Sequence, residues 1–152
     1  MKAVGLYRYL PIEHPESLLD LEVETPRASG RDLLVEVKAV SVNPVDTKRR
    51  APGLKNADTV ELSPKILGFD AAGVVKAAGL ECSLFRPGDA VYYAGSVVRQ
   101  GTNSELHLVD ERIVGRKPAS LSFAEAAALP LTTLTAWELM FERMGISRTG
   151  EH

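Results

Sequence analysis

Apolar and polar residues alternate in several segments of the first 110 positions. In one of them, Leu33, Val35 and Val37 face one way while Glu36 and Lys38 face the other. A period of two, enriched in β-branched residues, is typical of a half-buried strand. On this pattern we predict strands at residues 2–9, 32–42, 68–75, 90–94 and 105–109.

Two local features refine the strand predictions. Residues 68–75 are small and apolar on both faces, which indicates a strand packed closely against other backbone. The fourth strand follows a turn in which Pro87 presets φ and Gly88 supplies the positive φ of a type II turn.

The pattern becomes helical after residue 118. Ser122 and Glu125 have the spacing of a capping box, and the alanine-rich helix that follows should stop before Pro130. A second helix is predicted from about residue 131 to residue 144, and Gly145 should end it. Its apolar stripe has spacings of three and four, and it consists of Leu134, Trp137, Phe141 and Met144.

Strands followed by helices predict a mainly β fold with C-terminal helices (α+β), a small, bent, barrel-like domain. The chain has 152 residues, 45% of them hydrophobic, which is enough for one domain with a real core. We find no internal repeat.

Charge and composition exclude several partners. A net charge of −2 gives no basic footprint for nucleic acid, and no apolar stretch approaches the roughly 20 residues of a membrane span. The N-terminus lacks the apolar core of a signal peptide. A lone cysteine, Cys82, is compatible with a reducing compartment, so we predict a cytoplasmic protein without a membrane partner.

Metal-ligating and nucleophilic motifs are missing from the sequence. Cys82, His14, His107 and His152 show no paired zinc-ligand spacing. Neither a G-x-S-x-G elbow nor a glycine-rich phosphate loop occurs, so we do not expect a Rossmann unit within these 152 residues.

Two polar segments remain as candidate sites. In the first, Asn43 precedes Pro44, and Asp46 follows at capping distance. In the second, Thr132, Thr133 and Thr135 share one helical turn. Both have an ordinary structural explanation, namely a capped turn and hydroxyls that bond back to the preceding helical turn.

The order of these motifs resembles the medium-chain dehydrogenase/reductase superfamily, in its zinc-type alcohol dehydrogenase-like and quinone oxidoreductase branch. The resemblance spans nearly the whole chain. It rests on AVSVNPVDTK at residues 39–48, PKILGFDAAGVV at 64–75, FRPGDAVY at 85–92 and LSFAEAAALPLTTLTAWE at 121–138.

This resemblance implies a GroES-like bent β-barrel for residues 1–120 and a helical connection over residues 121–152 toward a missing Rossmann domain. The cofactor of such proteins lies in the cleft between the two domains. We therefore expect the 152-residue chain to be a fragment that binds NADPH weakly and is inactive alone.

The resemblance also bears on zinc. Zinc-dependent relatives place a cysteine where this chain has Asn43, and a histidine where it has Phe69 in the triplet Gly68-Phe69-Asp70. Because an amide and a phenyl ring are not zinc ligands, we expect no metal. The expected function is then NADPH-dependent reduction of a small-molecule quinone or enone.

Residue roles follow from the same resemblance. Asn43 would lie beside the nicotinamide as a catalytic and cofactor-binding residue, and Thr133 and Thr135 would contact the same end of the cofactor. Phe69 would form a wall of the substrate pocket. Tyr92 is a candidate proton donor, with a packed tyrosine as the plainer alternative.

Two other interpretations stay open. The chain could be a non-catalytic GroES-like oligomerisation module, or a zinc-type alcohol dehydrogenase relative with another substrate. A homodimer of the full-length protein is compatible with the resemblance. The physiological acceptor, the preference for NADPH over NADH and the oligomeric state are left undetermined by the sequence.

Overall fold

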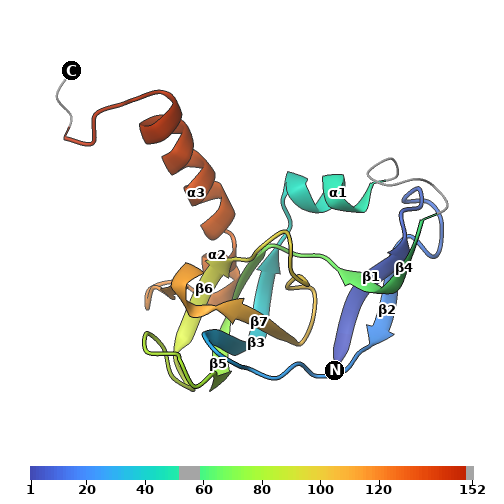
Figure 1. Ribbon diagram of the computed structural model, residues 1–152. Helices are drawn as coiled ribbons and strands as arrows, with labels where there is room; N and C mark the ends of the chain where they lie inside the picture. The colour runs from blue at the N-terminus through green and yellow to red at the C-terminus, as the bar shows by residue number, and fades with distance from the viewer. Residues whose placement is uncertain (52–58, 150–152) are drawn as a thin grey trace.

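The computed structural model describes residues 1–51 and 59–149, whose strands form two antiparallel sheets (Figure 1). The three-stranded sheet has the order β2 (Leu19–Glu22), β1 (Lys2–Arg8), β4 (Val60–Ile66). The five-stranded sheet has the order β7 (Leu106–Asp110), β3 (Asp32–Ser41), β5 (Asp70–Ala78), β6 (Ala90–Ala94), β8 (Val114–Arg116).

The helices lie outside the two sheets. Helix α1 (Pro44–Arg50) follows β3, and a 3-10 turn (Glu111–Ile113) separates β7 from β8. Helix α2 (Phe123–Ala127) packs on one face of the five-stranded sheet, and α3 (Pro130–Trp137) leads away from both sheets (Figure 1). A π-helical segment (Glu138–Arg143) continues α3.

The mainly β fold with C-terminal helices is confirmed, and all five predicted strands are present. Three further strands were missed, because β2 and β8 are short and β4 contains a proline and mostly polar residues. The two sheets of the described residues are not closed into one barrel. They are joined by a bridge between Ala3 and Ser104 and by a hydrogen bond from Val4 N to Asn103 O, 2.8 Å long.

The main core lies on the inner face of the five-stranded sheet. It consists of Leu33, Val35, Ala71, Val75, Val91, Tyr93 and Val109, each at most 2% exposed. The predicted close packing of β5 is confirmed, because a Cβ built on Gly73 would lie 2.2 Å from the carbonyl oxygen of Glu36 on β3.

The outer face of the same sheet is covered by α2. Ala126 and Ala127 are fully buried against Ala72 of β5. The predicted capping box is present: Ser122 N donates to Glu125 Oε2 at 2.8 Å, and Glu125 N donates to Ser122 Oγ at 3.2 Å. The helix ends before Pro130, as predicted.

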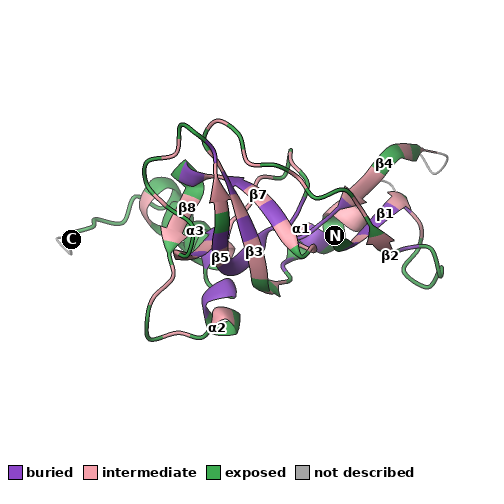
Figure 2. Ribbon diagram, turned by 90° about the horizontal axis from the view of Figure 1, so that it is seen from below, coloured by how far each residue is buried: buried purple, intermediate pink, exposed green. Residues whose placement is uncertain are grey.

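The second helix behaves differently from an ordinary packed amphipathic helix. Of its predicted apolar stripe, Leu134, Trp137 and Met144 are 59%, 45% and 63% exposed. Phe141 packs edge-on to Trp137, with ring centroids 4.6 Å apart. Figure 2 shows this contrast, with buried residues on the strands and exposed ribbon toward the C-terminus. Among the helices of the described residues, none is long and apolar enough to cross a bilayer.

Candidate functional site

The first candidate segment forms a tight connection from β3 into α1. Asn43 has extended backbone (φ −126°, ψ 165°), as expected before a proline, and Pro44 begins the helix. Asp46 Oδ2 accepts a hydrogen bond from Asn43 N at 2.8 Å. The capped turn expected from Asn43 and Asp46 is therefore confirmed.

Asp46 also fixes a second backbone segment. Its Oδ1 accepts from Gly68 N at 3.0 Å. Gly68 has a φ of 99°, and a Cβ built there would lie 2.5 Å from Thr102 Oγ1. Only glycine combines this φ with so close an approach. The α1 turn and the start of β5 are thus held at a fixed separation.

Asp70 connects the two candidate segments. Its carboxylate is fully buried, with Oδ2 accepting from Asn43 Nδ2 at 2.8 Å and Oδ1 accepting from Leu131 N at 2.9 Å. Leu131 lies in the first turn of α3, two residues before Thr133. A single carboxylate therefore joins the Asn43 turn to the threonine-bearing helix.

Burial sets the electrostatics of this carboxylate. Desolvation raises the pKa of Asp70, the hydrogen bonds from Asn43 and Leu131 oppose that shift, and the nearby charge of Asp46 adds to it. Buried groups with a shifted pKa are concentrated at functional sites, so Asp70 marks this region as a candidate site. Sequence reasoning did not assign Asp70 a role. The available signal was a charged residue inside the otherwise small and apolar run 68–75.

The threonines of α3 divide into two kinds. Thr132 Oγ1 bonds back to Ala128 O and Leu129 O, and Thr135 Oγ1 bonds back to Leu131 O at 2.8 Å. The structural explanation thus accounts for these two hydroxyls. Thr133 is exposed, and its hydroxyl makes no hydrogen bond within residues 1–51 and 59–149. Thr133 therefore has the side chain most available to a ligand.

Among the described residues, neither Tyr92 nor Phe69 forms a hydrogen bond with the Asn43 amide. Tyr92 is half-buried on the outer face of β6, packed with α2 and the alanines beneath it. Within the described part of the chain, its hydroxyl forms no hydrogen bond. Phe69 is 2% exposed and lies in the core. Their roles as proton donor and pocket wall stay predictions.

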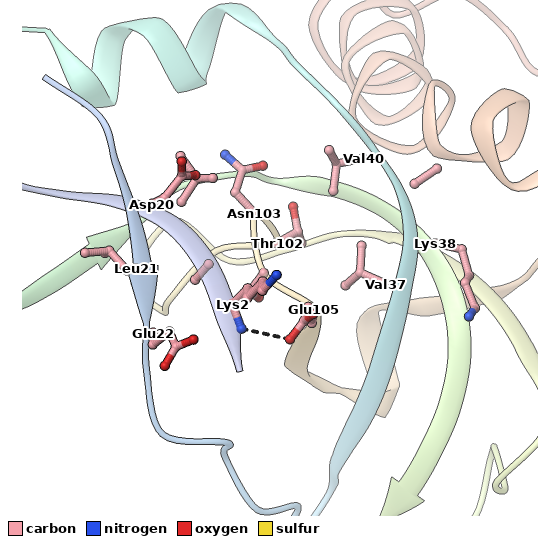
Figure 3. Close-up of a pocket in the computed structure, with 14 residues that line it drawn as sticks. Lys2, Asp20, Leu21, Glu22, Val37, Lys38, Val40, Thr102, Asn103 and Glu105 are labelled. Atoms are coloured by element: carbon pink, nitrogen blue, oxygen red, sulfur yellow. Dashed lines mark hydrogen bonds between the residues drawn. The ribbon is translucent and has the colours of Figure 1, made fainter. Parts of the chain in front are cut away.

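The described residues contain a wide groove elsewhere in the fold. It has a volume of about 870 Å³ and runs between β1 and β2 on one side and β3 on the other (Figure 3). Val37 and Val40 line one wall, and Lys2 N donates to Glu105 Oε2 at 2.8 Å on the other. None of the predicted site residues lines this groove.

The residues at the Asn43 site do not fit zinc. Asn43 offers an amide already bonded to Asp70, Phe69 offers no donor atom, and both oxygens of Asp70 accept hydrogen bonds. His107 is bonded elsewhere, to Tyr93 and Gln100, and His152 lies outside the described residues. Across residues 1–51 and 59–149, no group of three His, Cys, Asp or Glu side chains is arranged to hold a metal ion.

The sequence matches the alcohol dehydrogenase GroES-like domain family over residues 29–137. It is 40% identical over 148 residues to a zinc-type alcohol dehydrogenase-like protein of Staphylococcus epidermidis, covering 97% of this chain and 42% of that protein. It is 37% identical over 137 residues to 2-methylene-furan-3-one reductase of Solanum lycopersicum, covering 85% of this chain and 34% of the relative.

Solved structures show the same similarity. A protein of Rhizobium etli CFN 42, provisionally named a zinc-dependent alcohol dehydrogenase, is 58% identical with a TM-score of 0.86 over 93% of this chain and 40% of its own. The quinone oxidoreductase of Escherichia coli, solved with NADPH, is 30% identical with a TM-score of 0.79, over 94% and 41%. The chain thus spans about 40% of the length of these proteins.

Proposed function

Because this chain belongs to the alcohol dehydrogenase GroES-like domain family, we propose that it is the N-terminal domain of a zinc-independent oxidoreductase that uses NADPH to reduce quinones or enones. Its relatives are oxidoreductases of the medium-chain family. Two of them support the finer assignment. One is a quinone oxidoreductase solved with NADPH, and the other is named for the reduction of a conjugated ketone.

The observation that carries the zinc-independent part is the hydrogen bond between Asn43 and Asp70. The bond uses the amide nitrogen of Asn43 and is 2.8 Å long. Asn43 stands where zinc-dependent relatives have a cysteine. One N–H of its amide is bonded to Asp70, and the neighbouring Phe69 is a core side chain. A quinone or enone spreads incoming charge over its conjugated system, so it has less need of a Lewis acid than an alcohol has.

When bound, NADPH would supply the hydride, and the residues of this chain would orient the reactants and shape the site. Asn43 follows β3 and is 7% exposed, with its Nδ2 toward Asp70. Its second amide N–H would donate to the carboxamide oxygen or to the acceptor oxygen. Thr133 presents an exposed hydroxyl from α3, and Thr135 lies half a turn further along the same helix. We give Tyr92 as proton donor and Phe69 as pocket wall a lower rank than Asn43 and the threonines.

The exposed apolar stripe that runs along α3 and the π-helical segment after it supports a second domain in the full-length protein. Leu134, Trp137 and Met144 present a run of large apolar side chains that this domain leaves uncovered. We propose that residues 121–152 connect to a Rossmann domain that binds most of the cofactor and covers this stripe. The isolated chain is then expected to be inactive.

Steady-state assays on the full-length protein test the proposed function. NADPH oxidation should be measured with a panel of quinones, enones and primary and secondary alcohols, and the zinc content of the protein should be determined in parallel. We expect turnover of quinones or enones without stoichiometric zinc. Turnover of alcohols alone, dependent on bound zinc, would instead identify a zinc-type alcohol dehydrogenase, the second candidate favoured by the name of the Rhizobium etli relative.

Calorimetry on the 152-residue chain tests the domain assignment. If most contacts to NADPH come from another domain, the chain alone should show no binding at micromolar concentrations of NADPH. Micromolar affinity would contradict the assignment.

The unpaired Cys82 is compatible with our placement of the protein in the cytoplasm.

A further inference from the structure

We propose that Asp70 is a positioning residue for hydride transfer, and that its carboxylate fixes the Asn43 amide relative to the first turn of α3. This role depends on the proposed function, because Asp70 would fix the distance between the Asn43 amide and α3 at the reacting site. It concerns a residue that touches neither cofactor nor substrate but holds two elements that do.

The geometry places Asp70 between two donors that are far apart in sequence. Its Oδ2 receives Asn43 Nδ2 at 2.8 Å, and its Oδ1 receives Leu131 N at 2.9 Å. Its own backbone is held on both sides, because it pairs with Ser41 of β3 and with Ala94 of β6. The carboxylate is therefore a fixed point from which both elements are located.

The chemistry of the two partners requires a carboxylate at this position. An amide N–H and a backbone N–H can only donate, so the residue between them must offer two acceptor atoms. Asparagine has the same shape as aspartate but offers one oxygen and one NH₂ group. In an Asp70→Asn variant, one of the two partners would face another donor. The Asn43 amide would then lose its bond or turn over.

Asp70 accepts the hydrogen bond that orients the amide nitrogen of Asn43. The backbone of Asn43 is fixed by the bond to Asp46 and by Pro44, so the turn itself should survive the substitution. The hydrogen bond from Asn43 Nδ2 to Asp70 determines which face of the amide is presented at the site. Without this hydrogen bond, the amide should shift from its position at the site. Such a shift lowers kcat, because hydride transfer depends on the relative orientation of the reacting groups.

Two variants at position 70 separate positioning from packing. Asp70→Asn is isosteric but lacks one acceptor, whereas Asp70→Glu keeps both acceptors and adds a methylene to a fully buried site. If packing alone matters, Asp70→Glu should be the more damaging change. If the number of acceptors matters, Asp70→Asn should have the lower kcat.

The test is a comparison of full-length wild type, Asp70→Asn, Asp70→Glu and Tyr93→Phe. The last variant is the matched control, because it removes a buried hydrogen bond from the inner face of the same sheet without touching Asn43 or α3. We expect kcat of Asp70→Asn to fall about tenfold to a hundredfold with KM for NADPH within threefold of wild type. Asp70→Glu should lose less, and Tyr93→Phe should keep its kcat despite a lower Tm.

The outcomes distinguish this proposal from the proposed function. Absence of NADPH-dependent turnover in the wild type would contradict the proposed function itself. Given an active wild type, the positioning role is overturned if Asp70→Asn keeps its kcat, or if Asp70→Glu is slower than Asp70→Asn. It is equally overturned if the loss in kcat follows the loss in Tm across all variants, Tyr93→Phe included.

Discussion

The two faces of the five-stranded sheet each bury a polar site, and the two sites are built differently. On the inner face, Tyr93 OH lies 3.0 Å from His107 Nδ1, and His107 Nε2 lies 3.0 Å from Gln100 O. On the outer face, the buried Asp70 binds Asn43 and the first turn of α3. Both sites consist of buried polar groups, but their partners lie in different parts of the molecule.

The inner site is closed. A carbonyl oxygen can only accept, so His107 Nε2 donates to Gln100 O and its Nδ1 accepts from Tyr93. Burial raises the pKa of Tyr93 and lowers the pKa of His107 to about 4, so both groups stay neutral. Tyr93 and His107 lie on strands of the five-stranded sheet, and their third partner is the backbone of Gln100. The pair therefore contributes to the stability of the fold.

The outer site is open toward the exposed end of the molecule. Asp70 is buried, but the helix it holds carries an exposed Trp137 and a Thr133 hydroxyl without a hydrogen bond to any described residue. The difference between the two faces shows that a buried polar group can either stabilise the core or position residues at a surface. The location of its partners distinguishes the two cases, because a hydrogen bond to an exposed helix fixes the position of that helix.

The largest effect should come from a change that disrupts the sheet on which both sites depend. Gly73→Ala places a Cβ 2.2 Å from the Glu36 carbonyl oxygen in the middle of the β3–β5 pairing. We expect a loss of about 3 kcal/mol or more in the free energy of unfolding, or failure to fold.

Gly88→Ala is the matched control for that change, since its φ of 97° is strained for alanine but a Cβ there meets nothing within 4 Å. It should cost about 1 kcal/mol. Denaturant unfolding measures both variants. Equal effects would mean that the close approach at Gly73 is relieved by a shift of the strands.

Acidification should weaken the inner site. The folded-state pKa of His107 is about 4, below its ordinary value of 6.5, so the unfolded chain binds the proton more readily. The stability contributed by neutral His107 is present above pH 6.5 and is lost as the pH falls toward 4, by about 3 kcal/mol. The raised pKa of Asp70 has the opposite sign, since it favours the fold at lower pH.

Chemical unfolding of wild type and His107→Gln between pH 7 and pH 4 checks this prediction. The difference in free energy of unfolding between the two should shrink as the pH falls. A constant difference across this range would show that His107 is not held neutral by burial.

Removing one hydroxyl from the inner site gives a smaller change. Tyr93→Phe leaves His107 Nδ1 without its donor in a position that is 4% exposed. The expected cost is about 1–3 kcal/mol in the free energy of unfolding. Thermal and denaturant unfolding measure it, and an unchanged stability would mean that water replaces the hydroxyl.

The smallest effect is expected on the open side, at the threonines. Thr133→Val removes an exposed hydroxyl with no hydrogen bond to any described residue, so stability should stay within about 0.5 kcal/mol of wild type. If this hydroxyl binds the cofactor, KM for NADPH of the full-length protein should rise about fivefold, the value of one hydrogen bond.

Thr132→Val is the control for Thr133→Val, because the Thr132 hydroxyl already bonds to Ala128 O and Leu129 O. Its KM should stay at the wild-type value. Equal KM values for the two variants would remove Thr133 from the cofactor site.

The sequence predicted those parts of the fold that depend on local pattern. The alternation over residues 32–42, the turn at Gly88 and the capping box at Ser122 were all found in the structure. Strand β4 was missed because its polar residues and Pro64 give no alternation, and only its pairing with β1 makes it a strand.

The candidate site was predicted less completely, for a related reason. Asn43 and the threonines were noticed because each is unusual in its own segment, and their expected roles came from the resemblance to a known family. The role of Asp70 could not be predicted in this way, because it depends on a pairing that brings β5 next to α3, 61 residues away. The exposure of Thr133, in contrast to its back-bonded neighbours, likewise required the helix geometry.

One measurement tests the central claim that the Asn43–Asp70 site belongs to a zinc-independent NADPH-dependent reductase. The full-length protein is stripped of metal with a chelator, and NADPH oxidation with a quinone and an enone is followed before and after zinc is added back. We predict the same kcat in the metal-free and the zinc-treated protein. Turnover that disappears with the metal and returns only with zinc would contradict the claim.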